Sequence, residues 1–274
     1  EGDTVATLKI SNDFQDALKN KDLSLHYQPI INMENGALAG FEALMRWEHP
    51  ERGFISPAIF IPVIEDSGLI LEASAWALDE ACRALKRIEA QTGYNNALYM
   101  SVNFSATDFA SENFVDSVYN TLSATDVQAH NLCLEITERI LMGQPDNARD
   151  TLEMCRKAGM RIAIDDFGTG YSSLSYLHYF PIQTLKIDRS FIIEMMHKEQ
   201  SLALVRSIIG LGKSLDMKVI AEGVENKNEA TVLKDLGCDA AQGYYFARPQ
   251  SESEIIRAIQ SDAFNTDALF ASAS

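Results

Sequence analysis

The chain has 274 residues, enough for one large α/β domain or two ordinary ones, with 46% hydrophobic and 23% charged residues. This composition is typical of a globular protein with a sizeable core. Acidic residues outnumber basic ones, 39 against 23, which gives a formal charge of −16. That balance argues against binding to nucleic-acid polymers, which requires a positive footprint. The net charge does not exclude binding of a small anionic ligand, because bound cations can make the local electrostatic potential positive.

Targeting signals are missing from the sequence. No apolar run is long enough to span a membrane and no signal peptide is visible, so we expect a cytoplasmic domain without direct membrane contact. The four cysteines form no Cys-x-x-Cys pair and are expected to be buried free thiols. Since the chain starts at Glu1 rather than Met, we expect a segment of a longer signalling protein, which could itself be anchored in a membrane.

Segments with strand and helix periodicity alternate along the chain. Residues 23–47 are predicted to form two strands joined by a tight turn at Glu34-Asn35-Gly36, because Asn-Gly favours primed turns. Helices are expected at 57–68 and 70–90. The predicted elements that follow are strands at 97–104, 131–137, 160–165, 184–188, 218–222 and 240–246, and helices at 112–122, 146–159, 201–215, 226–237 and 251–260.

This order of elements predicts the fold. Alternating strands and helices imply a parallel sheet, and eight such units in ~250 residues have the size of a TIM barrel. The hairpin can only join antiparallel neighbours, so one strand of the barrel should be reversed. No linker or low-complexity stretch divides the chain. We therefore predict one α/β domain, a single (β/α)8 TIM-like barrel, with a core at about 8–260 and a polar tail at 261–274.

Polar residues recur where the predicted strands end, and the carboxyl ends of the strands carry the active site in such barrels. One or two of them would mean little, because core strands usually end in turn-forming residues. Oxygen ligands at four successive strand ends, followed by a lysine and a glutamate, predict a metal-centred site. The residues in this pattern are Glu42, Arg46, Asn103, Glu135, Asp165, Asp166, Lys186, Asp188, Glu222 and Gln242.

The ligand types narrow the choice of metal. Carboxylate and amide oxygens without His or Cys suit Mg²⁺ or Mn²⁺ rather than Zn²⁺ or copper. The five histidines share no strand-end pattern and are interpreted as structural or surface residues. Adjacent Asp165 and Asp166 repel each other unless a cation lies between them. One carboxylate can bridge two cations while its neighbour binds the second, as in two-metal cleavage of phosphate esters. The glycine-rich stretch 168–170 predicts a mobile loop beside them.

Eight short motifs resemble those of the EAL-domain cyclic di-GMP phosphodiesterase family, occur in family order and cover roughly residues 8–260. They are YQPI (27–30), FEALMRW (41–47), VNFS (102–105), LEITE (134–138), DDFGTGYSSL (165–174), LKID (185–188), AEGVE (221–225) and QGYYFARP (242–249). The departures are mild: FARP stands where a small residue, Lys and Pro are commoner, and Met45 fills a variable position. Neither departure touches an expected metal ligand.

The resemblance implies a (β/α)8 barrel with an antiparallel first strand that hydrolyses cyclic di-GMP to linear 5′-pGpG in bacterial second-messenger signalling. Two Mg²⁺ or Mn²⁺ ions are implied, and Ca²⁺ is expected to inhibit or substitute poorly, because its coordination shell is larger and looser. The implied ligands of the first metal are Glu42, Asn103, Glu135 and Asp165, and those of the second are Asp165 and Asp166.

The same resemblance implies the other roles. Lys186 would orient or polarise the attacking water, and Glu222 would act as general base or hold a metal-bound water. Glu138 would tether the glycine-rich loop. The residues implied to contact the dinucleotide are Gln28, Leu44, Arg46 and Gln242.

Other interpretations stay open at this point. Degenerate EAL domains bind cyclic di-GMP without cleaving it, and the intact metal set favours the enzyme over such a receptor. Arg46 could be a surface salt-bridge partner, Lys186 a solvated lysine and Glu225 a catalytic residue, although a structural bond across a loop is favoured for Glu225. The tryptophans and the aromatic run 244–246 are expected to pack in the core and at the rim rather than to stack on bases.

The resemblance to this family also implies binding partners and additional domains. We expect a homodimer formed around residues 171–180 and the helix after Arg189, because the stretch carries several aromatic and apolar side chains. The parent chain is expected to carry an N-terminal sensor or a diguanylate-cyclase-like domain.

Overall fold

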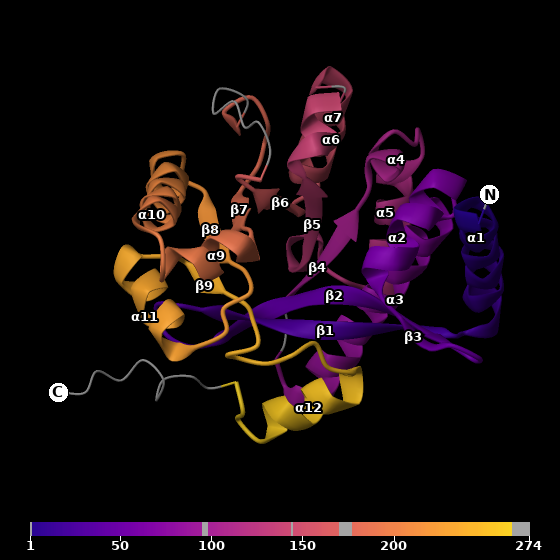
Figure 1. Ribbon diagram of the computed structural model, residues 1–274, viewed down its shortest axis with the longest axis horizontal. Coiled ribbons are helices and arrows are strands. Elements are labelled where there is room, and N and C mark those ends of the chain that lie inside the picture. Colours follow the sequence, from indigo (N-terminus) through magenta and orange to yellow (C-terminus); the bar gives the residue numbers. More distant parts are fainter. Residues whose placement is uncertain (1, 95–97, 144, 170–176, 265–274) are drawn as a thin grey trace.

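The computed structural model describes residues 2–94, 98–143, 145–169 and 177–264, and its strands form a closed barrel (Figure 1). The hydrogen-bonded order is β1-β9-β8-β7-β6-β5-β4-β2, and pairing of β1 with β2 closes the ring, while β3 extends β2 outside it. The strands are β1 (Leu23–Asn32), β2 (Leu38–His49), β3 (Gly53–Ile55), β4 (Tyr99–Phe104), β5 (Leu132–Thr137), β6 (Arg161–Phe167), β7 (Thr184–Ile187), β8 (Lys218–Ala221) and β9 (Ala240–Ala241).

The first strand is the reversed one. β1 pairs antiparallel with both β2 and β9, whereas the neighbours from β2 through β4 to β9 pair in parallel. The predicted eight-stranded barrel with an antiparallel first strand is therefore confirmed. The carboxyl ends of seven strands meet at one mouth, and the amino-terminal end of β1 meets them there.

The connection between β1 and β2 is longer than the predicted tight turn. Residues 33–37 join the two strands, and the Oδ1 of Asn32 accepts hydrogen bonds from the backbone N–H of Glu34 at 2.8 Å and of Asn35 at 3.3 Å. Met33 is only 1% exposed, and its N–H donates to the carbonyl of Asp239 at 3.0 Å. Burial of this side chain draws the chain inward before it turns, so a two-residue turn does not form.

Helices surround the barrel. Those described are α1 (Gly2–Asn20), α2 (Pro57–Ser67), α3 (Ile70–Thr92), α4 (Ala106–Phe109), α5 (Phe114–Thr125), the 3₁₀ turn η1 (Ala129–Asn131), α6 (Glu138–Gly143), α7 (Pro145–Lys157), α9 (Arg189–Met195), α10 (Glu199–Ser214), α11 (Lys227–Leu236) and α12 (Glu252–Gln260). In Figure 1, α2, α3 and α5 cover one side of the barrel and α10 and α11 another. Among the described residues, none of these helices is both long and apolar enough to cross a bilayer.

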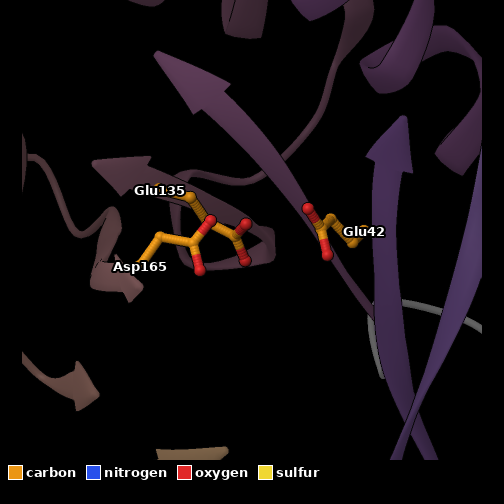
Figure 2. A group of neighbouring side chains, drawn as sticks. All are labelled: Glu42, Glu135 and Asp165. Carbon is orange, nitrogen blue, oxygen red and sulfur yellow. The ribbon is translucent and has the colours of Figure 1, made fainter. Parts of the chain in front are cut away.

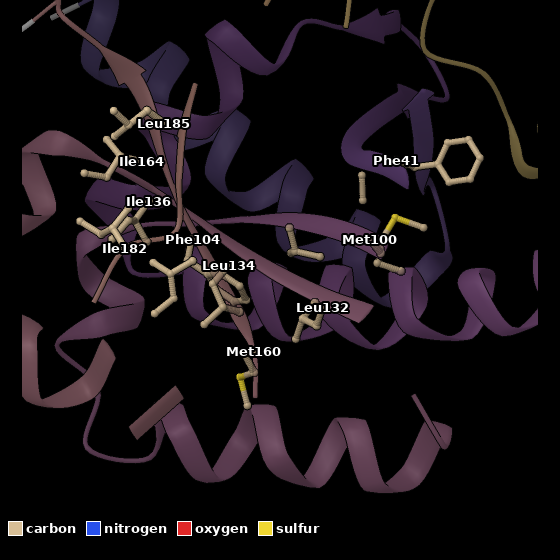
Figure 3. Packing of buried hydrophobic residues seen from close by; sticks show 14 of the residues in the cluster. Phe41, Met100, Phe104, Leu132, Leu134, Ile136, Met160, Ile164, Ile182 and Leu185 are labelled. Atoms are coloured by element: carbon tan, nitrogen blue, oxygen red, sulfur yellow. The ribbon is translucent and has the colours of Figure 1, made fainter. Parts of the chain in front are cut away.

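The main core lies between the strands and the helices (Figure 3). On β5, Leu132, Leu134 and Ile136 enter this core, so the residues between them, Cys133 and Glu135, point into the barrel. A smaller apolar cluster fills the interior of the barrel, and its members are Ile30, Tyr99, Cys133, Ala163, Ile220 and Ala240. Since Cys133 lies two residues before Glu135, this cluster packs next to the charged layer at the mouth. The four cysteines are free and buried, as predicted.

Helix α1 was not predicted from the sequence. Its Phe14 is fully buried, with its ring centroid 5.2 Å from that of Trp47 and 5.4 Å from that of Phe60. Trp47 is fully buried as well, which confirms its expected core role. Burial of Phe14 and Ala17 in the cluster that contains Trp47 and Phe60, rather than a strong helical pattern, holds this helix in place.

The last strand is much shorter than predicted. β9 ends at Ala241 instead of residue 246. Gly243 takes a φ of +155°, and a Cβ added to it would lie 2.2 Å from both the backbone N and O of Val224. The chain therefore passes against the backbone of Val224, where only glycine fits, and turns out of the sheet.

Candidate active site

The strand register brings the predicted carboxylates to one end of the barrel. Asn103 on β4 pairs with Glu135 on β5, and Asp165 on β6 pairs with Thr137, two residues after Glu135. Glu42 is buried and is the fifth of the 12 residues of β2, because this strand continues past the mouth to His49. Figure 2 shows the side chains of Glu42, Glu135 and Asp165 converging from three strands, so the strand-end pattern in the sequence corresponds to one cluster in space.

A β-bulge explains why two aspartates stand side by side. Neighbouring residues of a regular strand point to opposite faces. The pairing of β6 with β7 shifts register between Ile164 and Phe167, and Asp166 takes a φ of +54°. An oxygen of Asp165, one of Asp166 and one of Glu222 lie within 4.8 Å of one another. The bulge thus turns both aspartates toward the same site.

Lys186 on β7 lies among the carboxylates. Its side chain is 0% exposed, and its Nζ lies 2.7 Å from an oxygen of Glu135 and 2.7 Å from an oxygen of Glu222. The oxygens of Glu42 and Asp165 lie 3.3 Å and 3.5 Å from the same nitrogen. This burial excludes the interpretation of Lys186 as a solvated lysine. One ammonium group faces four carboxyl groups, so it cannot neutralise all four when they are ionised together.

Amide side chains complete the polar layer. The Nδ2 of Asn103 donates to Glu42 at 2.8 Å, and the Nε2 of Gln242 donates to Glu42 at 2.5 Å and to Glu222 at 3.0 Å. Both amides therefore leave their oxygens free of these contacts. Oε1 of Glu135 and Oε1 of Gln242 are buried without a hydrogen-bond partner among the described residues. Buried acceptors of this kind are costly unless something binds them.

The ionisation of the cluster reflects its burial. Burial raises the pKa of Glu135 well above its usual range, and Lys186 only partly opposes that shift. Burial also raises the pKa of Glu222 to about 8, and burial together with the adjacent carboxylate raises the pKa of Asp166. At Glu42 burial is outweighed, because Lys186 and amide hydrogen bonds hold its pKa below the usual value. Such a cluster favours binding of additional positive charge.

Two groups of carboxylates could each hold a metal ion. Oxygens of Glu42, Glu135 and Asp165 lie within 4.8 Å of one another, and the second group consists of Asp165, Asp166 and Glu222. Asp165 belongs to both groups. The donors are all oxygens, as Mg²⁺ and Mn²⁺ prefer, and Glu135, whose Oε1 has no hydrogen-bond partner among the described residues, belongs to the first group. The residues present therefore fit two hard divalent cations.

The remaining predicted site residues border this cluster. Gln28 is buried on β1, opposite Glu42 in the register, and its Nε2 donates to the carbonyl of Ala247 at 3.3 Å. Leu44 and Arg46 are half-buried further along β2. The guanidinium of Arg46 donates to the carbonyl of Met45 at 2.9 Å.

No carboxylate of the described residues lies within 4.0 Å of the Arg46 guanidinium, so this residue is not a salt-bridge partner within the described part of the chain. A half-buried guanidinium with this environment is suited to an anionic ligand.

Three further residues lie near the mouth of the barrel, and their contacts or positions belong to the segments that follow the strands. Asp188 caps α9, where its Oδ1 accepts from the N–H of Ser190 at 3.0 Å. Glu225 forms an ion pair with Arg189, which joins the segments after β8 and β7 and agrees with the structural role favoured for it. Glu138 is the first residue of α6, directly after β5. Its expected loop partner falls in a segment, 167–173, of which residues 170–173 lie outside the described part.

The comparisons with known proteins agree with this geometry. The EAL domain family profile matches residues 11–249, and the chain therefore belongs to the EAL domain family. The resemblance seen in the sequence motifs is thereby confirmed.

Curated relatives carry additional parts. The bifunctional diguanylate cyclase/cyclic di-GMP phosphodiesterase MucR of Pseudomonas aeruginosa is 42% identical over 252 residues, which are 92% of this chain and 36% of MucR. The cyclic di-GMP phosphodiesterase NbdA of the same organism is 38% identical over 259 residues, 93% of this chain and 33% of NbdA. The chain thus spans about a third of the length of these relatives.

Solved structures share the fold. The PaMucR phosphodiesterase in complex with c-di-GMP has a TM-score of 0.86 at 42% identity, covering 90% of this chain and 99% of that one. The EAL enzyme Bd1971, bound to cAMP and cyclic di-GMP, has a TM-score of 0.90 at 39% identity, covering 94% of this chain and 70% of that one. The FimX EAL domain, at 20% identity and a TM-score of 0.77, shows the shared fold alone.

Proposed function

We propose that this chain is a phosphodiesterase domain that hydrolyses one phosphodiester bond of cyclic di-GMP, giving linear 5′-pGpG, with two Mg²⁺ or Mn²⁺ ions. The observation that carries the proposal is the position of Asp165, whose carboxylate belongs to both candidate metal groups. A shared carboxylate is what a pair of cations acting on one phosphate requires. The names of the relatives support the choice of substrate.

The metal ligands would be those expected from the sequence, with Glu42, Asn103, Glu135 and Asp165 at the first ion and Asp165 and Asp166 at the second. When bound, such ions stabilise charge on a phosphate and lower the pKa of a water molecule. Glu222 belongs to the second group of carboxylates, so a cation bound there would favour its carboxylate form. A carboxylate oxygen of Glu222 would then accept a proton from the attacking water. The Nζ of Lys186, which lies 2.7 Å from Glu222 Oε1, would hold this carboxylate in place.

Substrate binding would fall to the residues that border the cluster. Arg46, without a carboxylate partner among the described residues, would contact a phosphate group. Gln28 and Gln242 would place hydrogen-bonding groups on either side of Glu42, and Leu44 would offer apolar contact. The protein thus supplies position and electrostatic field rather than a covalent nucleophile.

A receptor that binds cyclic di-GMP without cleaving it is the competing function. It would not need two carboxylate groups that share Asp165 or a buried lysine among four carboxylates. We therefore favour the enzyme. The parent protein would be a larger cytoplasmic-facing signalling protein with an N-terminal sensor or cyclase-like domain. The homodimer expected around residues 171–180 and α9 also stays a prediction, and residues 171–176 lie outside the described part.

The test is direct. The purified chain is incubated with cyclic di-GMP and Mg²⁺ or Mn²⁺, and the products are separated by chromatography. Linear pGpG should accumulate as cyclic di-GMP disappears. Tight binding without any product would support the receptor instead.

Metal removal should stop the reaction. With excess EDTA, turnover should fall to background, because the carboxylates alone cannot stabilise a phosphate of like charge. Ca²⁺ should restore little activity, since its longer bonds and looser shell disturb the geometry of in-line attack. Initial rates across a titration of each ion measure this, and undiminished turnover in excess chelator would refute the metal assignment.

Loss of the proposed loop tether, Glu138, should reduce turnover less than removal of the metal ions does. Glu138→Ala should weaken both metal affinity and turnover, although Glu138 is not among the proposed ligands, because its position directly after β5 suits a tether for the segment after Asp166. Outer partners of a metal site typically contribute ~10–100-fold to affinity or rate. The comparison is the Mg²⁺ dependence of turnover in parent and variant, and identical curves would show that the tether does not act on the metals.

A further inference from the structure

A second cavity lies at the end of the barrel opposite the carboxylate cluster. Its volume is about 510 Å³. It is lined by residues at which strands begin, since Tyr99 opens β4, Arg161 opens β6 and Thr184 opens β7. Asn32, the last residue of the reversed β1, lines it as well. Parallel strands begin at the end of the barrel away from the active-site mouth, so this lower cavity is separate from the proposed catalytic site.

Small side chains inside the barrel leave room for the lower cavity. Barrels of this type are usually filled by layers of bulky branched residues. Here the interior cluster includes Cys133, Ala163 and Ala240, and β9 contributes only two residues to the wall. The larger members that line the cavity, Tyr99 and Ile220, give it an apolar floor. A cavity of this volume with an apolar floor and a few polar groups is typical of small-molecule binding sites.

Arg161 presents unused hydrogen-bond donors to the lower cavity. Its Nε donates to the carbonyl of His130 at 2.8 Å, and its Cζ lies 4.6 Å from the ring centroid of Tyr99. These two contacts hold the guanidinium in place. Among the described residues, no carboxylate lies within 4.0 Å of this guanidinium, and neither terminal nitrogen donates a hydrogen bond. A pair of free terminal nitrogens is the arrangement that binds a carboxylate through two parallel hydrogen bonds.

Thr184 adds a second polar group on the neighbouring strand. It pairs with Ala163 of β6, two residues after Arg161. Thr184 is only 9% exposed and lines the same cavity, yet its hydroxyl forms no hydrogen bond with the described part of the chain. Buried hydroxyl groups normally have a partner. A molecule bound beside Arg161 would supply one.

The charge of the lower cavity selects the kind of anion. Its charged lining residues are three bases and two acids, namely Arg161, Lys218, Lys234, Glu34 and Asp239. Lys218 and Asp239 compensate each other, with Nζ and Oδ1 2.7 Å apart. Burial raises the pKa of Cys133 and of Cys238 to about 12, so both thiols are uncharged. A single excess positive charge matches a monocarboxylate better than a doubly charged phosphate.

We propose that the lower cavity binds a small monocarboxylate with an apolar or aromatic body. The carboxylate would accept hydrogen bonds from the terminal nitrogens of Arg161 and from the hydroxyl of Thr184. The body of the ligand would lie against Tyr99 and Ile220. This ligand is distinct from cyclic di-GMP, and its binding does not depend on hydrolysis at the mouth.

Fluorine NMR tests the proposal with three probes: fluorobenzoate, fluorophenylacetate and the neutral analogue fluorobenzamide. Each is titrated into the parent chain in EDTA, because the carboxylates at the mouth then carry no divalent cations and repel an anionic probe. At least one of the two acids should bind saturably with a Kd in the millimolar range or below, and the amide should not. Absence of saturable binding by both acids, or equal binding of the amide, would overturn the proposal.

Variants locate the bound probe. Arg161→Met should raise the Kd roughly 10-fold or more, because charge-assisted hydrogen bonds are lost. Arg161→Lys should recover only part of this loss, since an ammonium group lacks the paired donors. Thr184→Val keeps the shape of the side chain and should raise the Kd roughly 2- to 10-fold.

Arg83→Met is the matched control for these variants. Arg83 is 48% exposed on α3, forms an ion pair with Asp79 and does not line the cavity, so its variant should bind the probe as the parent does. Urea unfolding shows whether each variant is folded, and Thr184→Val decides the result if Arg161→Met does not fold. Parental Kd values in the folded variants of Arg161 and Thr184 would place the probe elsewhere and overturn the assignment.

Discussion

Glu42→Gln is expected to abolish turnover of cyclic di-GMP while leaving the fold intact. The substitution keeps the size of the side chain and removes one carboxylate of the first candidate metal group. It also removes the charge that accepts from Asn103 and Gln242. The loss should exceed the ~10–100-fold effect typical of an outer partner of a metal site. Initial rates at saturating Mg²⁺ measure it.

Binding should behave differently from turnover in this variant. Arg46 and Gln28 lie outside the carboxylate group and remain available to the ligand. Cyclic di-GMP should therefore still bind to Glu42→Gln. The matched control is Glu48→Gln, which changes an exposed glutamate on the same strand and should act as the parent does. Near-parental rates in Glu42→Gln at ordinary Mg²⁺ concentrations would remove Glu42 from the ligand set.

The strand ends were predictable because alternation and parallel register are local rules. Leu132, Leu134 and Ile136 define one face of β5, so Glu135 had to point the other way. Once the barrel was inferred, equivalent positions on neighbouring strands had to meet at one mouth. The sequence alone therefore located the cluster without any side-chain geometry.

The geometry inside the cluster was not predictable in the same way. The bulge after Ile164 and the positive φ of Asp166 depend on how β6 meets β7, which no local pattern records. The four carboxylate contacts of Lys186 likewise come from four different segments. Sequence reasoning could name the residues but not the sharing of Asp165 between two groups.

Tertiary contacts also overrode local propensity in two elements. Residues 240–246 contain aromatic residues typical of strands, yet close approach of Gly243 to the backbone of Val224 ends β9 at Ala241. Conversely, α1 carries a weak apolar pattern, and burial of Phe14 beside Trp47 is what positions it.

Removing the positive charge of Lys186 from the carboxylate cluster should have the largest effect on the free energy of unfolding. Among the described residues, Lys186 is the only lysine, arginine or histidine whose side-chain nitrogen lies within 4.0 Å of the carboxylates of Glu42, Glu135, Asp165 and Glu222. Lys186→Met keeps the length of the side chain and leaves these groups without a positive partner. Breaking a buried ion pair on one side typically costs about 3–5 kcal/mol. We therefore expect the free energy of unfolding in EDTA to fall by that order.

Divalent ions should separate the structural role of Lys186 from its catalytic one. Mg²⁺ binds the folded chain and supplies positive charge to the same carboxylates, so it should restore much of the stability of Lys186→Met. Turnover should stay ~10²–10⁴-fold below the parent, because the cation does not replace a group that orients the attacking water. Urea unfolding with EDTA and with Mg²⁺, together with initial rates, gives both quantities. Lys218→Met is the matched control, since Lys218 is 74% exposed at the far end of β8 and pairs with Asp239 alone among the described carboxylates. If Mg²⁺ restored turnover of Lys186→Met together with its stability, Lys186 would act only as a structural counter-charge, and the orientation of the attacking water would have to be assigned to Glu222.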